Sequence, residues 1–238
     1  MAYQVMKITG DVFGIALWDS SWNSYNNCYL IKRSGAFILI DCGKEEQSHE
    51  LMAALSQIGV DREHIRVLIA THGHKDHTGA SHLFTLAEKW IHVHDAVRLS
   101  PKQQEEFQKM DSCTGEIRGL SFTLLGHHTE GSIALYDPAT HCLFCGDHIC
   151  FFGEKLPQEG LLTFGAHLRV KTREFVTAWS QNQEDRHKYR FDVFVQGLQL
   201  LSSYKEIEFL ATGHGPVLRT QIHDFLNSLV SATDNPTT

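Results

Sequence analysis

The chain has 238 residues, of which 42% are hydrophobic and 21% are charged, and its formal net charge is −7. These values are typical of a globular protein that can bury a substantial core. The acidic balance argues against nucleic-acid binding, which needs clustered Lys and Arg, and no apolar run is long enough to span a membrane.

The N-terminus and the cysteines indicate where in the cell the protein is expected and whether disulfide bonds are expected. The first seven residues, MAYQVMK, lack the apolar core of a signal peptide, so we expect a cytoplasmic protein. Six cysteines at scattered spacings do not form the pattern of a disulfide framework. Cys142 and Cys145 have the C-x-x-C spacing of redox or zinc sites, but we favour a strand with the two thiols on opposite faces.

The first half of the chain predicts strands followed by alternating helices and strands. Strands are expected at 3–7, 12–18, 26–33 and 36–40, and a helix at 44–58 carries Leu51, Leu55 and Ile58 on one stripe. A buried strand at 67–70 follows. A helix near 79–88, a short strand at 90–94 and a helix beginning at Pro101 complete this half.

The second half of the chain also combines strands and helices. Strands are expected at 120–125, 132–136 and 142–145, and two helices over 168–203. A strand at 207–211 precedes a last helix whose apolar stripe contains Leu218, Ile222, Phe225 and Leu229. The whole pattern predicts an α/β fold.

A loop after the strand at 67–70 is the most informative segment. It places His72, His74, Asp76 and His77 within six positions. In an extended loop His72 and His74 point the same way and can share one metal ion, while Asp76 and His77 can reach a second. Imidazole and carboxylate together suit Zn²⁺ and also Fe or Mn.

Three more candidate ligands follow strand-like runs, each beside a glycine that lets the backbone turn. They are His128, Asp147 and His214. Strand ends that meet at one edge of a sheet would bring these side chains to the same place. Asp41 ends the neighbouring strand and is a candidate hydrogen-bond partner for a histidine ligand.

Together these motifs resemble the metallo-β-lactamase superfamily of metal-dependent hydrolases. The resemblance implies a single domain over residues 1–238 with a four-layer αβ/βα sandwich and the site at its lip. It implies that His72, His74 and His128 hold a first metal ion, that Asp76, His77 and His214 hold a second, and that Asp147 bridges both. This seven-residue set is similar to that of glyoxalase II and lactonases.

The third histidine motif departs from the family's usual pattern. His127 stands where the family usually has glycine, and the following Thr129, Gly131 and Ser132 fit the usual motif when His128 is the ligand. We therefore expect His127 to lie behind the ligands or at the mouth. His148 and His167 are weaker candidates for substrate contacts, and the loops near 18–25 and 151–167 are expected to set specificity.

The function implied by the resemblance is a hydrolase with two divalent metal ions, most often Zn²⁺, with Fe or Mn as alternatives. A hydroxide bridging the two ions would attack a small ester, thioester or lactone, and Asp76 would orient it and carry the proton. A mononuclear iron persulfide dioxygenase and a non-catalytic metal-binding relative are the alternatives. The expected partner is a small-molecule substrate, with neither nucleic acid nor membrane.

Overall fold

Two β-sheets form the centre of the computed structural model, which describes residues 2–233. The first sheet has seven strands in chain order, antiparallel from β1 to β4 and parallel from β4 to β7. Its strands are β1 Tyr3–Lys7, β2 Val12–Asp19, β3 Ser24–Arg33, β4 Ala36–Ile40, β5 Ile65–Ile69, β6 Glu88–His92 and β7 Phe107–Met110.

The second sheet also has seven strands, in the order β12-β14-β13-β11-β10-β9-β8. Parallel pairing of β11 with β13 brings a late segment of the chain into the middle of this sheet. Its strands are β8 Thr114–Ile117, β9 Leu120–Leu124, β10 Ile133–Asp137, β11 Cys142–Gly146, β12 Leu162–Thr163, β13 Phe209–Thr212 and β14 Val217–Arg219.

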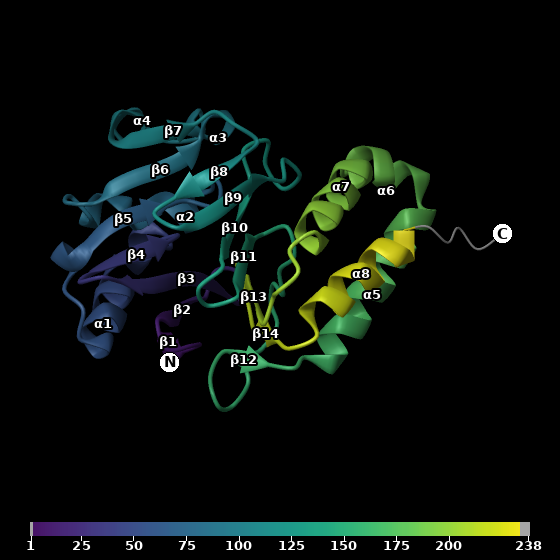
Figure 1. Cartoon of the computed structure of the whole chain (residues 1–238), viewed down its shortest axis with the longest axis horizontal. Coiled ribbons are helices and arrows are strands. Elements are labelled where there is room, and N and C mark those ends of the chain that lie inside the picture. Colours follow the sequence, from purple (N-terminus) through teal and green to yellow (C-terminus); the bar gives the residue numbers. More distant parts are fainter. Residues whose placement is uncertain (1, 234–238) are drawn as a thin grey trace.

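Helices cover the outer faces of the two sheets. Figure 1 shows α1 beside the first sheet and α5, α7 and α8 beside the second. The helical segments are η1 Glu45–Gln47, α1 Ser48–Ile58, η2 Arg62–His64, α2 Lys75–Thr78, η3 Gly79–Leu83, α3 Val93–Ala96, α4 Pro101–Glu106, α5 Ala166–Gln181, α6 Gln183–Lys188, α7 Phe191–Ser202 and α8 Ile222–Thr233.

Alternation along the strands separates three layers of buried side chains. In β4, Leu39 packs toward α1 whereas Ile40 packs between the sheets. In β11, Leu143 packs toward the C-terminal helices whereas Phe144 packs between the sheets. Successive strand residues point to opposite faces, so each sheet is buried on both sides. The predicted four-layer αβ/βα sandwich is confirmed.

The same alternation accounts for the C-x-x-C spacing. Cys142 lies in the core between the sheets, and Cys145 lies in the core under the C-terminal helices. Both thiols are buried and free. The strand interpretation of this motif is therefore confirmed.

Several predicted elements need correction. The helix expected at 79–88 is only the short η3, because β6 begins already at Glu88 and leaves little room for a longer helix. The strand expected at 90–94 ends at His92, whose ring accepts a hydrogen bond from the backbone N–H of His94 and starts α3.

The C-terminal helices also differ from the prediction. Residues 168–203 contain three helices rather than two, because the Asn182 side chain caps α6 and Arg190 takes a left-handed conformation before α7. Leu218 belongs to β14 and pairs with Leu210, so the last helix starts only at Ile222. The short strands β7, β8 and β12 had no predicted counterpart.

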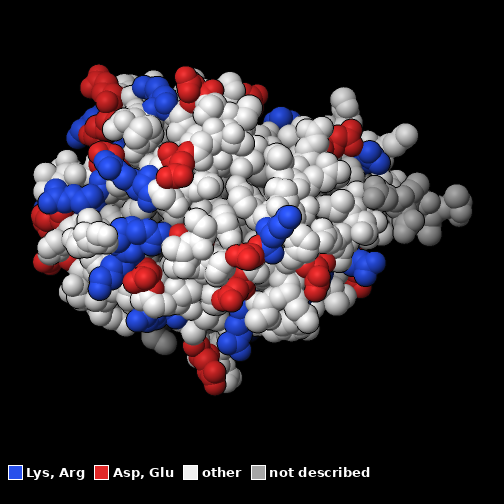
Figure 2. All heavy atoms as spheres, viewed as in Figure 1, with Lys and Arg blue, Asp and Glu red and all other residues white. Residues whose placement is uncertain are grey.

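Charged side chains of both signs lie on the face shown in Figure 2, with a broad uncharged area near its middle. Within residues 2–233 no helix is both long and apolar enough to cross a membrane.

Candidate metal centre

Loops at the ends of four strands bring all seven predicted site residues together. The segment after β5, which includes the short α2, supplies four of them, and the β9–β10 loop, the end of β11 and the end of β13 supply one each. Both sheets therefore contribute to one centre. The residues from the β5 loop are His72, His74, Asp76 and His77, and the others are His128, Asp147 and His214.

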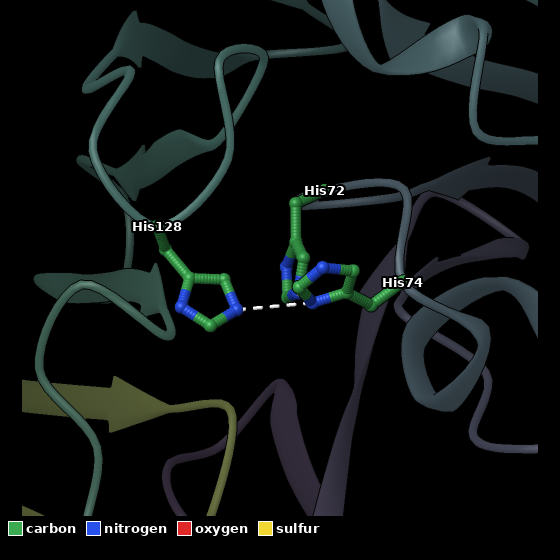
Figure 3. A group of neighbouring side chains, drawn as sticks. All are labelled: His72, His74 and His128. Atoms are coloured by element: carbon green, nitrogen blue, oxygen red, sulfur yellow. Dashed lines mark hydrogen bonds between the residues drawn. The ribbon is translucent and has the colours of Figure 1, made fainter. Parts of the chain in front are cut away.

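The first group consists of His72, His74 and His128, whose rings converge in Figure 3. Nδ1 of His74 lies 3.1 Å from Nε2 of His72 and 3.0 Å from Nε2 of His128. The side chain of His72 is fully buried, whereas that of His128 is 31% exposed. Three imidazole nitrogens with one side open to solvent are the arrangement of a catalytic zinc site.

The second group consists of Asp76, His77 and His214. Oδ2 of Asp76 lies 3.3 Å from Nε2 of His77 and 3.3 Å from Nε2 of His214. All three side chains are almost completely buried.

Asp147 lies between the two groups. Its Oδ2 is 3.4 Å from Nε2 of His128 and 3.1 Å from Nε2 of His214. Its Oδ1 is 3.6 Å from Nε2 of His77. One carboxylate thus reaches both groups, as a bridging ligand would.

The donor set fits divalent metal ions. Nε2 of His77 and Oδ1 of Asp147 are buried and make no hydrogen bond of ordinary geometry within the described residues. Buried polar atoms without partners cost free energy, and a metal ion supplies the missing partner. Five imidazoles and two carboxylates suit Zn²⁺, Fe and Mn.

Hydrogen bonds behind the centre fix the orientation of the rings. Nδ1 of His77 lies 2.8 Å from Oδ2 of Asp41, and Nδ1 of His214 lies 3.0 Å from the carbonyl oxygen of Tyr25. Each ring therefore turns its Nε2 toward the centre. The predicted contact of Asp41 with a site histidine is confirmed, and Asp41 also accepts hydrogen bonds from the backbone and hydroxyl of Thr71.

Asp95, which was not among the predicted site residues, connects two of the loops. This fully buried carboxylate accepts hydrogen bonds from the backbone N–H of Gly73 at 2.6 Å, the hydroxyl of Thr129 at 2.6 Å and the backbone N–H of Gly131 at 2.9 Å. A Cβ on Gly131 would lie 2.6 Å from the backbone nitrogen of Asp95, so the contact requires glycine. Asp95 sits in the short α3, and no spacing pattern marked it.

The fold, the loops and the donor set agree with one family. The family model for the metallo-beta-lactamase superfamily matches residues 22–166, which is more than half of the chain. The chain belongs to the metallo-beta-lactamase superfamily.

The chain is also similar to one curated protein and to several solved structures. A curated protein, the beta-lactamase-like protein 2 homolog of Caenorhabditis elegans, is 28% identical over 134 residues, which cover 54% of this chain and 45% of that protein. A flavoprotein from Thermotoga maritima has a TM-score of 0.76 and 21% identity over 99% of this chain and 62% of its own. The rubredoxin oxygen:oxidoreductase of Desulfovibrio gigas has a TM-score of 0.75 and 16% identity over 98% and 63%.

A fragment of a putative diflavin flavoprotein from Nostoc sp. PCC 7120 has a TM-score of 0.72 and 15% identity, with 98% of this chain and 95% of that fragment covered. This chain spans less than two-thirds of the worm protein and of the first two solved structures. The structural likenesses show the metallo-β-lactamase fold, and the glyoxalase II-like subtype stays a prediction.

The electrostatics of the metallo-β-lactamase centre differ between the two groups. Burial lowers the pKa of His128 to about 4, and burial also holds the pKa of His72 well below its usual range. Burial opposes the charged form of His214 too, but the Asp147 carboxylate outweighs it and raises the pKa to about 9. Burial likewise opposes ionisation of Asp76, yet the neighbouring His77 and His214 hold its pKa below its usual range.

The remaining histidines occupy different places around the centre. His127 points away from it, with Nε2 2.9 Å from the carbonyl oxygen of Tyr189. His148 is buried, and His167 is exposed in the first turn of α5 rather than in a loop. In the two predicted specificity loops, Trp22 and Phe152 flank His214, with ring centroids 6.5 and 5.0 Å from its ring.

Proposed function

We propose that the protein is a hydrolase that uses two divalent metal ions, Zn²⁺ by preference, to cleave a small ester, thioester or lactone. The observation that supports it most is the open three-histidine group joined by Asp147 to a second group. In this proposal His72, His74 and His128 hold one ion, Asp76, His77 and His214 hold the other, and Asp147 binds both.

The residues of the chain have separable tasks in this reaction. Bound ions would supply an activated water and polarise the carbonyl of the substrate. The exposed side of His128 gives that water and the substrate access from solvent. Asp76 is held ionised by His77 and His214, so its free carboxylate oxygen can accept a hydrogen bond from the attacking water and receive its proton.

An iron-dependent oxidation is the second candidate. The same imidazole and carboxylate donors suit iron. Several proteins with the same fold carry the name flavo di-iron protein, and one is named an oxygen:oxidoreductase. A persulfide dioxygenase reaction would need a metal that binds and reduces O₂, which zinc does not do. A metal-binding relative without catalysis is the third possibility.

Anaerobic hydrolysis by the zinc-loaded protein tests the proposal. We expect turnover of at least one member of a panel of esters, thioesters and lactones. Asp76→Asn should lower kcat by about 10² or more, because the amide cannot accept the proton. Asp61→Asn, at an exposed carboxylate far outside the centre, is the matched control and should leave the rate unchanged.

Metal content measured on the same samples separates the outcomes. Oxygen uptake with a persulfide that depends strictly on iron, without any hydrolysis, would establish the persulfide dioxygenase instead. Tight binding of two zinc ions with neither activity would favour the non-catalytic relative.

A further inference from the structure

A cavity of about 630 Å³ opens beside the metal centre, beneath α5, α6 and α7. Asp147 belongs both to its wall and to the centre, so the cavity reaches the edge of the centre. Its volume lies in the range of sites that hold small molecules. The first-sheet side of the centre does not contribute to its lining.

Aromatic side chains make up much of the wall. The ring of Trp179 lies 5.1 Å from that of Phe194, 5.8 Å from that of Phe175 and 6.4 Å from that of Tyr189. Trp179 and Phe194 are 9% and 5% exposed, whereas Phe175 and Tyr189 are 63% and 50% exposed. The inner wall is thus buried apolar surface, and its rim exposes two large aromatic rings of the kind that mark binding sites.

The rings of two histidines, His127 and His148, complete this wall. Nε2 of His127 faces the carbonyl oxygen of Tyr189 at 2.9 Å, and Nε2 of His148 faces that of Phe194 at 3.1 Å. A carbonyl oxygen only accepts, so each Nε2 carries a hydrogen and donates it. The ring of His148 stacks on Phe194 with centroids 4.9 Å apart.

The described residues of the wall offer no Lys or Arg that would pair with an anionic group. No Lys or Arg of the described chain lines the cavity, and Asp147 and Asp185 are its acidic members. A carboxylate or phosphate placed there would lose its hydration without gaining a cationic partner. An uncharged apolar group would gain from burial in proportion to its area.

We propose that this cavity binds an uncharged apolar acyl group of the substrate. The acyl carbonyl then lies at the metal centre, and the chain or ring attached to it runs past Asp147 toward Trp179 and Phe194. The assignment of the occupant as an acyl group rests on the proposed hydrolase function, whereas the apolar preference of the cavity does not.

The rate test uses 4-nitrophenyl acetate, butanoate, hexanoate and octanoate with the zinc-loaded full chain. We expect kcat/KM to rise about 4-fold per added methylene until the cavity is filled. Thr172→Trp places a large side chain at a half-buried position in the wall and should flatten this rise. Arg173→Trp, one residue further on α5 and outside the lining, is the matched control and should keep it.

The binding test does not depend on turnover. Acetamide, hexanamide and octanamide resist hydrolysis, and calorimetry measures their binding to the full chain with and without zinc. Octanamide should bind at least ~10-fold more tightly than acetamide in both forms, with a negative heat-capacity change. Thr172→Trp should remove this difference and Arg173→Trp should not, while both variants keep their melting temperature.

The outcomes separate this inference from the proposed function. Equal binding of octanamide and acetamide, or equal losses in the two tryptophan variants, would overturn the cavity assignment even if esters are hydrolysed. A flat chain-length profile in an active enzyme would overturn it as well. Tight octanamide binding at this wall without hydrolysis of any ester, thioester or lactone would support the apolar preference and contradict the hydrolase.

Discussion

Asp147 is the residue on which the two halves of the centre depend. Its carboxylate lies within 4 Å of an imidazole nitrogen of His72, His77, His128 and His214. Burial opposes the ionised form, but His77 and His214 hold the pKa of Asp147 well below its usual range. The carboxylate is therefore already ionised before a metal ion binds, so binding does not have to displace a proton from Asp147.

The adjacent pair His127 and His128 offers a direct test of which ring belongs to the centre. His128→Ala should remove metal from the first group, because its Nε2 lies 3.0 Å from Nδ1 of His74. His127→Ala should keep near-normal metal content, because its ring points to the carbonyl oxygen of Tyr189. Elemental analysis of the two purified variants measures their metal content. Metal loss in His127→Ala but not in His128→Ala would show that the ligand assignment is wrong.

The opposite pKa shifts of the two groups predict different proton release on metal binding. His214, with a pKa of about 9, is protonated at pH 7.5 and must lose its proton to bind a metal ion. His128, with a pKa of about 4, is already neutral. Zinc binding at pH 7.5 should therefore release about one proton fewer in His214→Gln than in the wild type, and an unchanged number in His128→Gln.

Calorimetry in two buffers of different ionisation enthalpy counts these protons. The difference in released protons between the wild type and His214→Gln should shrink as the pH rises through about 9, because His214 has then already lost its proton. A difference that persists at higher pH, or a larger one in His128→Gln, would contradict the predicted charge states.

At the scale of the element, α7 holds the cavity wall through a close approach to His148. A Cβ on Gly197 would lie 2.1 Å from Cε1 of the His148 ring, which is far inside contact distance. Gly197→Ala should therefore destabilise the fold by about 1–3 kcal/mol through overpacking, against the gain of alanine in a helix. Gln199→Ala, on the exposed face of α7, is the control and should leave stability nearly unchanged.

Urea unfolding of both variants measures this difference. Gly197→Ala should also change the alkanamide binding described above, because the displaced ring belongs to the cavity wall. A stable Gly197→Ala protein with wild-type unfolding midpoint would show that α7 can move away without cost.

The sequence predicts helices and strands correctly where a single hydrophobic periodicity dominates a segment. Strands such as β4 and β5 are apolar runs bounded by turns, and the loop after β5 carries its donors in one short stretch. Elements that depend on tertiary contacts were missed or misplaced. The boundary between α5 and α6 rests on a single side-chain cap at Asn182. Leu218 fits a helical stripe but lies in β14, where it pairs with Leu210 of β13.

The candidate site divides in the same way. Residues that follow apolar runs beside glycine could be predicted, since strand ends gather at one edge. Asp95 could not, because its role depends on Gly73 and Gly131 meeting it from loops distant in sequence. The cavity could not be predicted either, since Trp179 and Phe194 have the spacing of ordinary core residues.

At the scale of the whole molecule, the centre joins the edges of the two sheets. Tyr29 of the first sheet donates a hydrogen bond of 2.6 Å to the carbonyl oxygen of Thr212 in the second. The side-chain amide of Asn27 donates to the carbonyl oxygens of Thr212 at 3.0 Å and Gly215 at 2.8 Å. These bonds hold the loop of His214 in place before any ion binds.

Metal removal should accordingly lower the stability of the entire fold. Ions that bind only the folded state stabilise it by about 2.7 kcal/mol at a concentration 100 times Kd. For a chain of this size that corresponds to a loss of about 5–11 °C in Tm on chelation. Calorimetric scans with chelator, and again after zinc is restored, measure the shift, and superimposed scans would contradict a site shared by both sheets.

The placement of β13 between β11 and β14 has a consequence for how the protein acquires its metal during synthesis. His72, His74 and His128 precede β11 in the chain, whereas His214 follows β13. During synthesis, all three histidines of the first group therefore emerge from the ribosome well before His214 completes the second group. Nascent chains halted after β11 should capture one ion at most, and the second should enter only when the late strand pairs with its neighbours.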